Sequence, residues 1–139
     1  RAMKRDVALI YPDDLGPVWL YNELVRRAVE NIVRNGLRYA PEGTSVTVRV
    51  GRRDREGRPG ISILVHDRGP GVPKAELEEI FKPFYRTEAS RSRDTGGTGL
   101  GLAIARKAAL AHGGDIHAEL PPDGGLLVEM WLPVHPPGQ

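Results

Sequence analysis

Hydrophobic and polar residues follow two different periods along this chain of 139 residues. In the segment 44–50, Val46, Val48 and Val50 occupy every second position, which is typical of a strand with one buried face. In the segment 23–39, apolar residues recur every three or four positions, which predicts an amphipathic helix with Asn22 as its N-cap. The same reading predicts further strands at 7–11, 18–20, 61–65, 115–119 and 126–132, and further helices at 73–80 and 100–112.

These elements predict one α+β domain over residues 1–139, with its core in about 5–134. Hairpin pairing and helical crossovers together favour a mixed sheet of about five strands. With three helices on one face of that sheet, the simplest architecture is a two-layer α/β sandwich. The segment 81–97 is too polar to pack as a core element, and loops of this length are usually functional.

Two asparagines lie beside the apolar stripe of the predicted helix 23–39. The stripe itself comprises Val25, Ala28, Val29, Ile32 and Gly36. Asn31, Asn35 and Arg38 fall within about 60° of one another on its flank. Asparagine is a poor helix former, so two of them one turn apart need a reason. Either the row lines a cleft where a carboxamide oxygen can bind Mg²⁺, or both amides are partly buried and hydrogen-bonded.

A carboxylate directly follows the strand predicted at 61–65, in the run Asp67-Arg68-Gly69-Pro70-Gly71-Val72. The glycines allow a flat ligand to approach the backbone. A carboxylate only accepts hydrogen bonds, so Asp67 would favour the exocyclic amine of adenine over the carbonyl of guanine. The alternative is an ordinary Asp-Gly turn.

A glycine-rich run, Gly96-Gly97-Thr98-Gly99-Leu100-Gly101-Leu102-Ala103, opens the helix predicted at 100–112. Such glycines let backbone N–H groups reach an anion, and the positive end of the helix dipole favours phosphate. The run is not a P-loop, because no Gly-Lys-Ser/Thr follows. It also fits a dinucleotide fingerprint poorly, because a polar loop rather than a strand precedes it.

Composition excludes several classes of function. The chain has no cysteine, so disulfides, thiolate metal sites and a cysteine nucleophile are excluded. The formal net charge is only +2 and no nucleic-acid-reading motif accompanies it, so we expect no nucleic-acid partner. No apolar run approaches the roughly 20 residues that span a bilayer. The chain begins at Arg1 without a start methionine, so we expect a fragment of a longer protein, monomeric on its own.

Arginines cluster around the turn between the strands predicted at 44–50 and 61–65. They are Arg49, Arg52, Arg53, Arg55 and Arg58. We expect a solvated turn, with a docking patch as the alternative.

Four motifs, taken in order, resemble the boxes of bacterial two-component sensor histidine kinases. The run from Asn31 to Tyr39 resembles the N box, and the run from Asp67 to Gly71 resembles the G1 box. Phe81-Lys82-Pro83-Phe84-Tyr85-Arg86 resembles the F box, and the run from Gly97 to Leu102 resembles the G2 box. The resemblance covers about residues 5–134, and its wording is similar to that of the Cpx-type envelope-stress sensor kinases.

This resemblance implies the Bergerat ATP-binding fold, with ATP and Mg²⁺ as ligands. Asn35 would hold Mg²⁺, while Asn31 and Arg38 would contact the phosphates or the ion. Arg86 would approach the terminal phosphate, so that Asn35, Arg38 and Arg86 would be the catalytic residues. Gly36 and Arg38 stand where alanine and lysine are common in the family. The phosphates would be wrapped by Gly97, Thr98, Gly99, Leu100, Gly101 and Leu102.

The resemblance also assigns the adenine end of the site. Tyr39 would pack on the purine, and Asp67 would bind the adenine amine, partly through water. Gly69 and Gly71 would admit the ring beside Val72. Phe81 and Phe84 would anchor the base of an ATP lid at about 85–99.

Finally, the resemblance implies a kinase and not a hydrolase. In the ATP-hydrolysing relatives, a glutamate one turn before the Mg²⁺ asparagine activates water, whereas this chain has Asn31, whose amide is no base. The nucleophile would be a histidine on a separate dimerisation domain of the same parent, and a response regulator would be an indirect partner. None of the four histidines (His66, His112, His117 and His135) has the sequence context of that acceptor. The parent would be a homodimeric inner-membrane sensor kinase with this domain in the cytoplasm. The alternatives are a nucleotide-binding regulatory module without chemistry and an anti-sigma-type serine kinase of the same fold.

Overall fold

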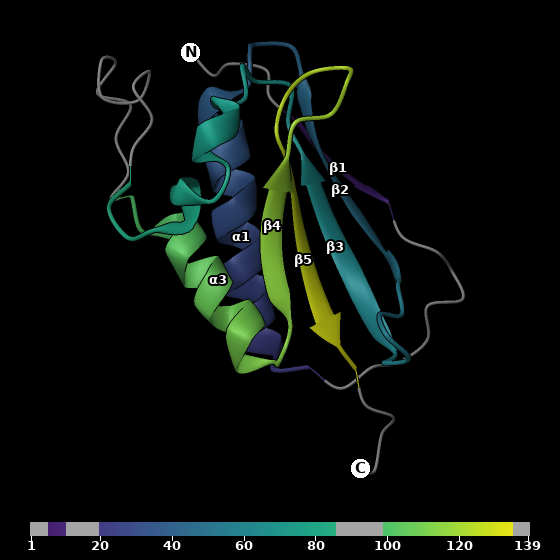
Figure 1. Ribbon diagram of the computed structural model, residues 1–139. Coiled ribbons are helices and arrows are strands. Elements are labelled where there is room, and N and C mark those ends of the chain that lie inside the picture. Colours follow the sequence, from purple (N-terminus) through teal and green to yellow (C-terminus); the bar gives the residue numbers. More distant parts are fainter. Residues whose placement is uncertain (1–5, 11–19, 86–98, 135–139) are drawn as a thin grey trace.

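The computed structural model describes residues 6–10, 20–85 and 99–134 (Figure 1). Its strands are β1 (Asp6–Ile10), β2 (Ser45–Arg52), β3 (Gly60–His66), β4 (Asp115–Glu119) and β5 (Leu127–Pro133). Its helices are α1 (Asn22–Tyr39), α3 (Gly101–Ala111) and two short 3₁₀ helices, η1 (Lys74–Glu76) and η2 (Glu79–Phe81).

The strands form one five-stranded mixed sheet in the order β1-β2-β3-β5-β4. β1 pairs with β2 in parallel, and the other three pairings are antiparallel. Helices α1 and α3 lie side by side against one face of this sheet (Figure 1). The predicted α+β sandwich with a mixed sheet is therefore confirmed.

The core fills the space between the two layers. Every second residue of the central strands faces the helices, as Ile61, Ile63 and Val65 do in β3. The helices contribute Ile32 and a series of small residues, of which Ala28, Ala105 and Ala109 are fully buried. Small side chains allow the helix axes to approach closely, and this brings the N-terminus of α3 against α1.

The expectation of three helices is wrong for the described residues, which contain two α-helices. Instead of one α-helix, the segment 73–80 contains η1 and most of η2. Burial of Ile80 and Phe81 turns the chain toward the core at this point. Short elements of this kind commonly adopt the tighter 3₁₀ geometry. The strand predicted at 18–20 lies outside the described residues except for Leu20, which is not in a strand.

The start of α1 also differs from the prediction. Tyr21 occupies the N-cap position and makes no side-chain cap, while Asn22 is the first helical residue. The backbone carbonyl of Tyr21 accepts from the N–H of Val25 at 3.0 Å and so closes the first turn. The imidazole Nε2 of His112 accepts from the Tyr21 N–H at 3.0 Å, which ties this end of α1 to the end of α3.

Candidate functional site

Helix α1 brings the asparagine row against both of the other predicted motifs. A Cβ built on Gly36 would lie 3.3 Å from the Cβ of Asp67, so the helix backbone touches the residue that follows β3. A Cβ built on Gly101 would lie 3.3 Å from Oδ1 of Asn31, so the first residue of α3 also touches α1. The three motifs, far apart in sequence, therefore meet along one helix.

The two asparagines have different surroundings. Asn31 donates through Nδ2 to the carbonyl of Arg27 at 2.9 Å and accepts through Oδ1 from Arg34 at 3.3 Å. Both polar atoms of Asn31 are therefore already hydrogen-bonded within α1. Asn35 is half-buried, and its side chain has no hydrogen-bond partner within the described residues. Its carboxamide oxygen is therefore available to a hard cation.

Asp67 is buried, with 5% of its surface exposed. Its Oδ1 accepts from the backbone N–H of Gly69 at 2.8 Å and from that of Leu126 at 3.2 Å. Burial raises the pKa of the Asp67 carboxyl, and these two N–H groups oppose the rise. Oδ2 makes no hydrogen bond within the described part of the chain, so one oxygen stays available to a ligand.

Tyr39 and Gly69 are also in contact. A Cβ on Gly69 would lie 2.9 Å from the carbonyl oxygen of Tyr39, so only glycine allows the loop after β3 to approach the end of α1 this closely. Gly71 has φ +73° and packs against Leu120 and Gly125. Val72 is half-buried against the core.

The glycine-rich run enters α3 as predicted. Gly99 has φ +78°, and its carbonyl accepts from the N–H of Phe84 at 2.8 Å. No side chain caps α3 at its N-cap, Leu100. The N–H groups of Gly101 and Leu102 have no partner within the described residues, which suits an anion at this helix end. Leu102 is buried, so only its backbone can reach a ligand.

The two phenylalanines of the F-box motif have different roles. Phe81 is buried in the core, whereas the side chain of Phe84 is 71% exposed. Phe84 anchors its segment through its backbone bond to Gly99 and holds a left-handed φ of 65°. Arg86, Gly97 and Thr98 lie outside the described residues. Arg38 is half-buried in the last turn of α1, one turn beyond Arg34.

Sequence reasoning missed Leu126 as a donor to Asp67. Leu126 belongs to the turn between β4 and β5, 59 residues away in sequence. The signal available in the sequence was the pair Gly124-Gly125, both of which take positive φ. A pair of glycines indicates a tight turn, but it does not indicate which segment the turn contacts.

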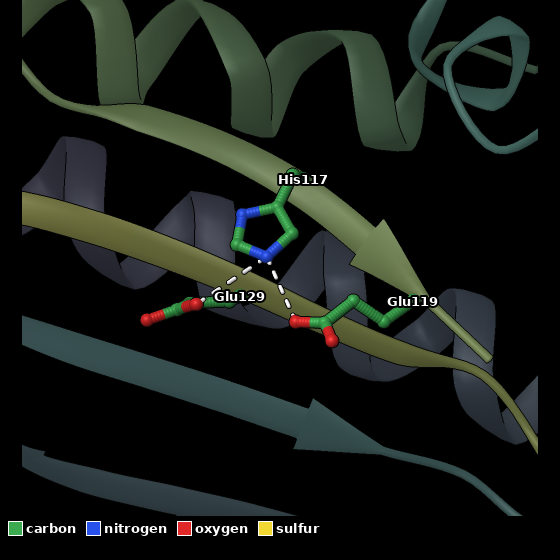
Figure 2. Close-up of side chains that lie close together, drawn as sticks. All are labelled: His117, Glu119 and Glu129. Atoms are coloured by element: carbon green, nitrogen blue, oxygen red, sulfur yellow. Dashed lines mark hydrogen bonds and ion pairs between the residues drawn. The ribbon is translucent and has the colours of Figure 1, made fainter. Parts of the chain in front are cut away.

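The opposite face of the sheet carries a separate polar cluster. Figure 2 shows His117 and Glu119 of β4 and Glu129 of β5 pointing toward one another. Nε2 of His117 lies 2.9 Å from Glu119 Oε2 and 3.4 Å from Glu129 Oε1 (Figure 2). These three residues offer one possible metal-ligand atom each, within 4.8 Å of one another. Glu129 Oε2, however, already accepts from Arg53 at 2.7 Å and from the Ser62 hydroxyl, so the cluster is explained by ion pairing.

The arginine-rich turn between β2 and β3 packs against the sheet and is not an entirely solvated turn. The Arg53 carbonyl accepts from Nε1 of Trp131 at 2.6 Å, and the guanidinium of Arg55 lies 5.0 Å from the Trp131 ring centroid. Arg55 also pairs with Asp115 at 2.7 Å. The turn folds back over the outer face of the sheet and covers Glu129 and Trp131, which are 1% and 3% exposed.

No helix within the described ranges is both long and apolar enough to cross a membrane.

Known proteins share this fold. The chain is 42% identical to the sensor histidine kinase CpxA of Escherichia coli over 133 residues, which are 96% of this chain and 28% of CpxA. It is 26% identical to the solved mycobacterial sensor histidine kinase MprB, with a TM-score of 0.74, and the match covers 95% of this chain and 85% of that one. ShkA, solved in complex with AMPPNP, shares the fold at 22% identity and a TM-score of 0.73, over 94% of this chain and 26% of ShkA.

The predicted resemblance to sensor histidine kinases, including the Cpx type, is confirmed by these relatives. The chain spans less than a third of the length of CpxA. Residues 21–136 match the family described as histidine kinase-, DNA gyrase B-, and HSP90-like ATPases, and the chain belongs to that family.

Proposed function

We propose that this chain binds Mg-ATP and transfers its γ-phosphoryl group to a histidine on a separate dimerisation domain of the same parent kinase. The observation that carries the proposal is the contact of α1 with both Asp67 and Gly101, through Gly36 and Asn31. The carboxylate proposed to read the base and the helix end proposed to bind the phosphates thereby both contact α1 beside its asparagine row.

Asp67 would select adenine. Two backbone N–H groups hold Oδ1, which leaves Oδ2 to accept from the exocyclic amine of the base. The same oxygen would meet the carbonyl of guanine with no proton between them, so GTP should bind much less well. The contact between Tyr39 and Gly69 would form the neighbouring wall, on which the purine packs.

Asn35 would hold the magnesium ion. Its carboxamide oxygen is a hard ligand with no competing hydrogen bond in the described residues, so the donor fits the ion. When bound, the ion would neutralise charge on the phosphates. Arg38, three residues further along α1, and Arg86 would add positive charge. Phosphoryl transfer depends chiefly on such positioning and neutralisation.

The site has no candidate base to activate water on α1. Asn31 is an amide, and both its polar atoms are hydrogen-bonded. The adjacent Glu30 is exposed and paired with Arg26 at 2.9 Å, so it points away from the row. Hydrolysis should therefore be slow, and an imidazole supplied by another domain would be the nucleophile.

Apolar side chains exposed beside the proposed phosphate end and along α3 support a docking partner. Phe84 is 71% exposed beside Gly99, and Ile104 and Leu110 on α3 are 43% and 55% exposed. A helical dimerisation domain that packs on these residues would bring its histidine toward the γ-phosphate. In the parent, a homodimeric sensor kinase of the inner membrane, this domain would lie in the cytoplasm and the response regulator would receive the phosphoryl group from that histidine.

The test mixes this domain with helical dimerisation domains of related kinases and γ-³²P-labelled ATP. With the native domain, we expect acid-labile, base-stable phosphate on the histidine of the dimerisation domain. With the Asn35→Ala variant, we expect no such phosphate. Binding of Mg-ADP without any transfer would instead identify a regulatory nucleotide-binding module. Acid-stable phosphate on serine would identify a serine kinase.

A further inference from the structure

We propose that Gly125 and Leu126, in the turn between β4 and β5, are positioning residues that fix the Asp67 carboxylate for adenine recognition. This inference rests on the proposed function, because it concerns the same carboxylate. Neither residue belongs to the motifs that carry the nucleotide-binding resemblance, and neither is expected to contact the nucleotide.

The first support is a pair of hydrogen bonds between Asp67 and Leu126. The backbone N–H of Asp67 donates to the Leu126 carbonyl at 3.0 Å, and the N–H of Leu126 donates to Oδ1 of Asp67 at 3.2 Å. Leu126 is itself buried, with 5% of its surface exposed. Backbone and side chain of Asp67 are therefore both oriented by one residue, which fixes which carboxylate oxygen faces the base.

The second support is the absence of space at Gly125. A Cβ built there would overlap the carbonyl oxygen of Asp67 and lie 3.4 Å from the Cα of Arg68. Because the colliding atoms are backbone, they cannot move aside by changing rotamer. Any side chain at position 125 must displace either the turn or the Asp67 backbone.

The turn is also tied to both neighbours of Asp67. Nε2 of His66 lies 3.0 Å from the carbonyl oxygen of Gly124, and Arg68 pairs with Asp123 at 3.0 Å. Both links are exposed, and an exposed ion pair contributes little to global stability. Because they hold the residues directly before and after Asp67, the two links restrict local movement of the turn relative to the carboxylate.

Gly124 and Gly125 provide a matched pair of variants. Both residues take positive φ, +98° and +79°, so alanine strains the backbone at either position. A Cβ on Gly124 meets nothing within 4 Å, whereas one on Gly125 collides with Asp67. The two substitutions thus share the backbone cost and differ in the effect on the carboxylate.

The experiment measures Mg-ADP affinity by isothermal titration calorimetry for the native domain and for Gly125→Ala, Gly124→Ala and Asp67→Asn. We expect Gly125→Ala to weaken binding by about 10-fold or more, the worth of one hydrogen bond to a charged group, and Gly124→Ala to stay within about 2-fold. Equal affinity for the two glycine variants would overturn the inference. No effect of Asp67→Asn would instead overturn the adenine role in the proposed function.

A pH series separates positioning from a general loss of structure. Without the Leu126 N–H, the Asp67 carboxylate is less well stabilised, so the loss of Mg-ADP binding on acidification should begin at a higher pH in Gly125→Ala than in the native domain. If Gly125→Ala does not fold, the double variant His66→Ala/Asp123→Ala removes the exposed links. Because His66 also lowers the pKa of Asp67 electrostatically, the readout for this variant is affinity at neutral pH. It should show a smaller, about 2- to 5-fold, loss of affinity, and an unchanged affinity would overturn the inference.

Discussion

Gly36 packs against Asp67 so closely that a Cβ at position 36 would lie 3.3 Å from the Cβ of Asp67. Glycine costs a helix interior about 1 kcal/mol relative to alanine, and the contact leaves little room for a larger side chain at position 36. The residue before it is Asn35. The spacing between the amide proposed to bind metal and the carboxylate proposed to read the base therefore depends on this contact.

A larger residue at position 36 should disturb this spacing. Gly36→Val would place methyl groups against Asp67 and Val46, and overpacking of this kind typically costs about 1–3 kcal/mol. We expect a lower free energy of unfolding in urea together with weaker Mg-ADP binding. Gly51→Val is the control, because a Cβ at position 51 meets nothing within 4 Å. A Gly36→Val protein with native affinity would show that the contact does not position Asp67.

Asp67→Asn should have opposite effects on binding and on the stability of the nucleotide-free domain. The amide keeps an oxygen for the Gly69 and Leu126 N–H groups but removes the cost of a buried charge. At neutral pH the variant should therefore unfold at a higher urea concentration than the native domain, while binding Mg-ADP about 10- to 100-fold less tightly.

The sign of the pH dependence follows from the raised pKa of Asp67. A group whose pKa is higher in the folded than in the unfolded state contributes stability below its unfolded pKa, and that contribution is lost as the pH rises through the folded pKa. The stability difference between Asp67→Asn and the native domain should thus shrink as the pH falls from 7 toward 4. A difference that grows on acidification would contradict this account of the carboxyl.

Asn35→Ala should remove the magnesium-dependent part of nucleotide binding. Calorimetric titrations with ADP, in Mg²⁺ and in excess EDTA, give that part directly. The native domain should bind more tightly with Mg²⁺, and the variant should bind equally in both. Asn31→Ala is the comparison variant. Both polar atoms of Asn31 already form hydrogen bonds, so this substitution should change the magnesium dependence less.

Glu129 and Glu119 allow the outer cluster to be tested apart from the nucleotide site. Both lie near His117, but Glu129 is 1% exposed and binds Arg53 and Ser62, whereas Glu119 is exposed. Glu129→Ala should lower the free energy of unfolding by about 2 kcal/mol, and Glu119→Ala by less than about 1 kcal/mol. Neither should change Mg-ADP affinity, since the helices lie on the other face of the sheet (Figure 1).

Periodicity predicted the central elements well, because their burial is one-sided. Val46 and Val48 in β2, and Ala28 and Ile32 in α1, face the core as their spacing indicates. The strand 115–119 has the predicted bounds. The helix predicted at 73–80 is wrong because burial of Ile80 and Phe81, a tertiary effect, decides the local geometry of this segment.

Candidate site residues can be proposed from the sequence where a motif carries them, but the contacts that a distant turn supplies to them cannot. The polar residues at Asp67 and Asn35 are recognisable by their local context. The donor at Leu126 is an ordinary backbone N–H, and only the pairing of β3 with β5 brings it to Asp67. The same holds for Arg53, which reaches Glu129 only because its turn folds over the sheet.

The most direct test of a single nucleotide site is an NMR titration of the ¹⁵N-labelled domain with Mg-ADP. The amide signals of Gly36, Gly69 and Gly101 report on the asparagine row, the proposed adenine end and the proposed phosphate end, respectively. We predict that all three shift together and fit one dissociation constant, and that GDP at the same concentrations leaves them nearly unmoved. Signals of Gly69 and Gly101 that respond with different dissociation constants, or do not respond to Mg-ADP, would contradict the account.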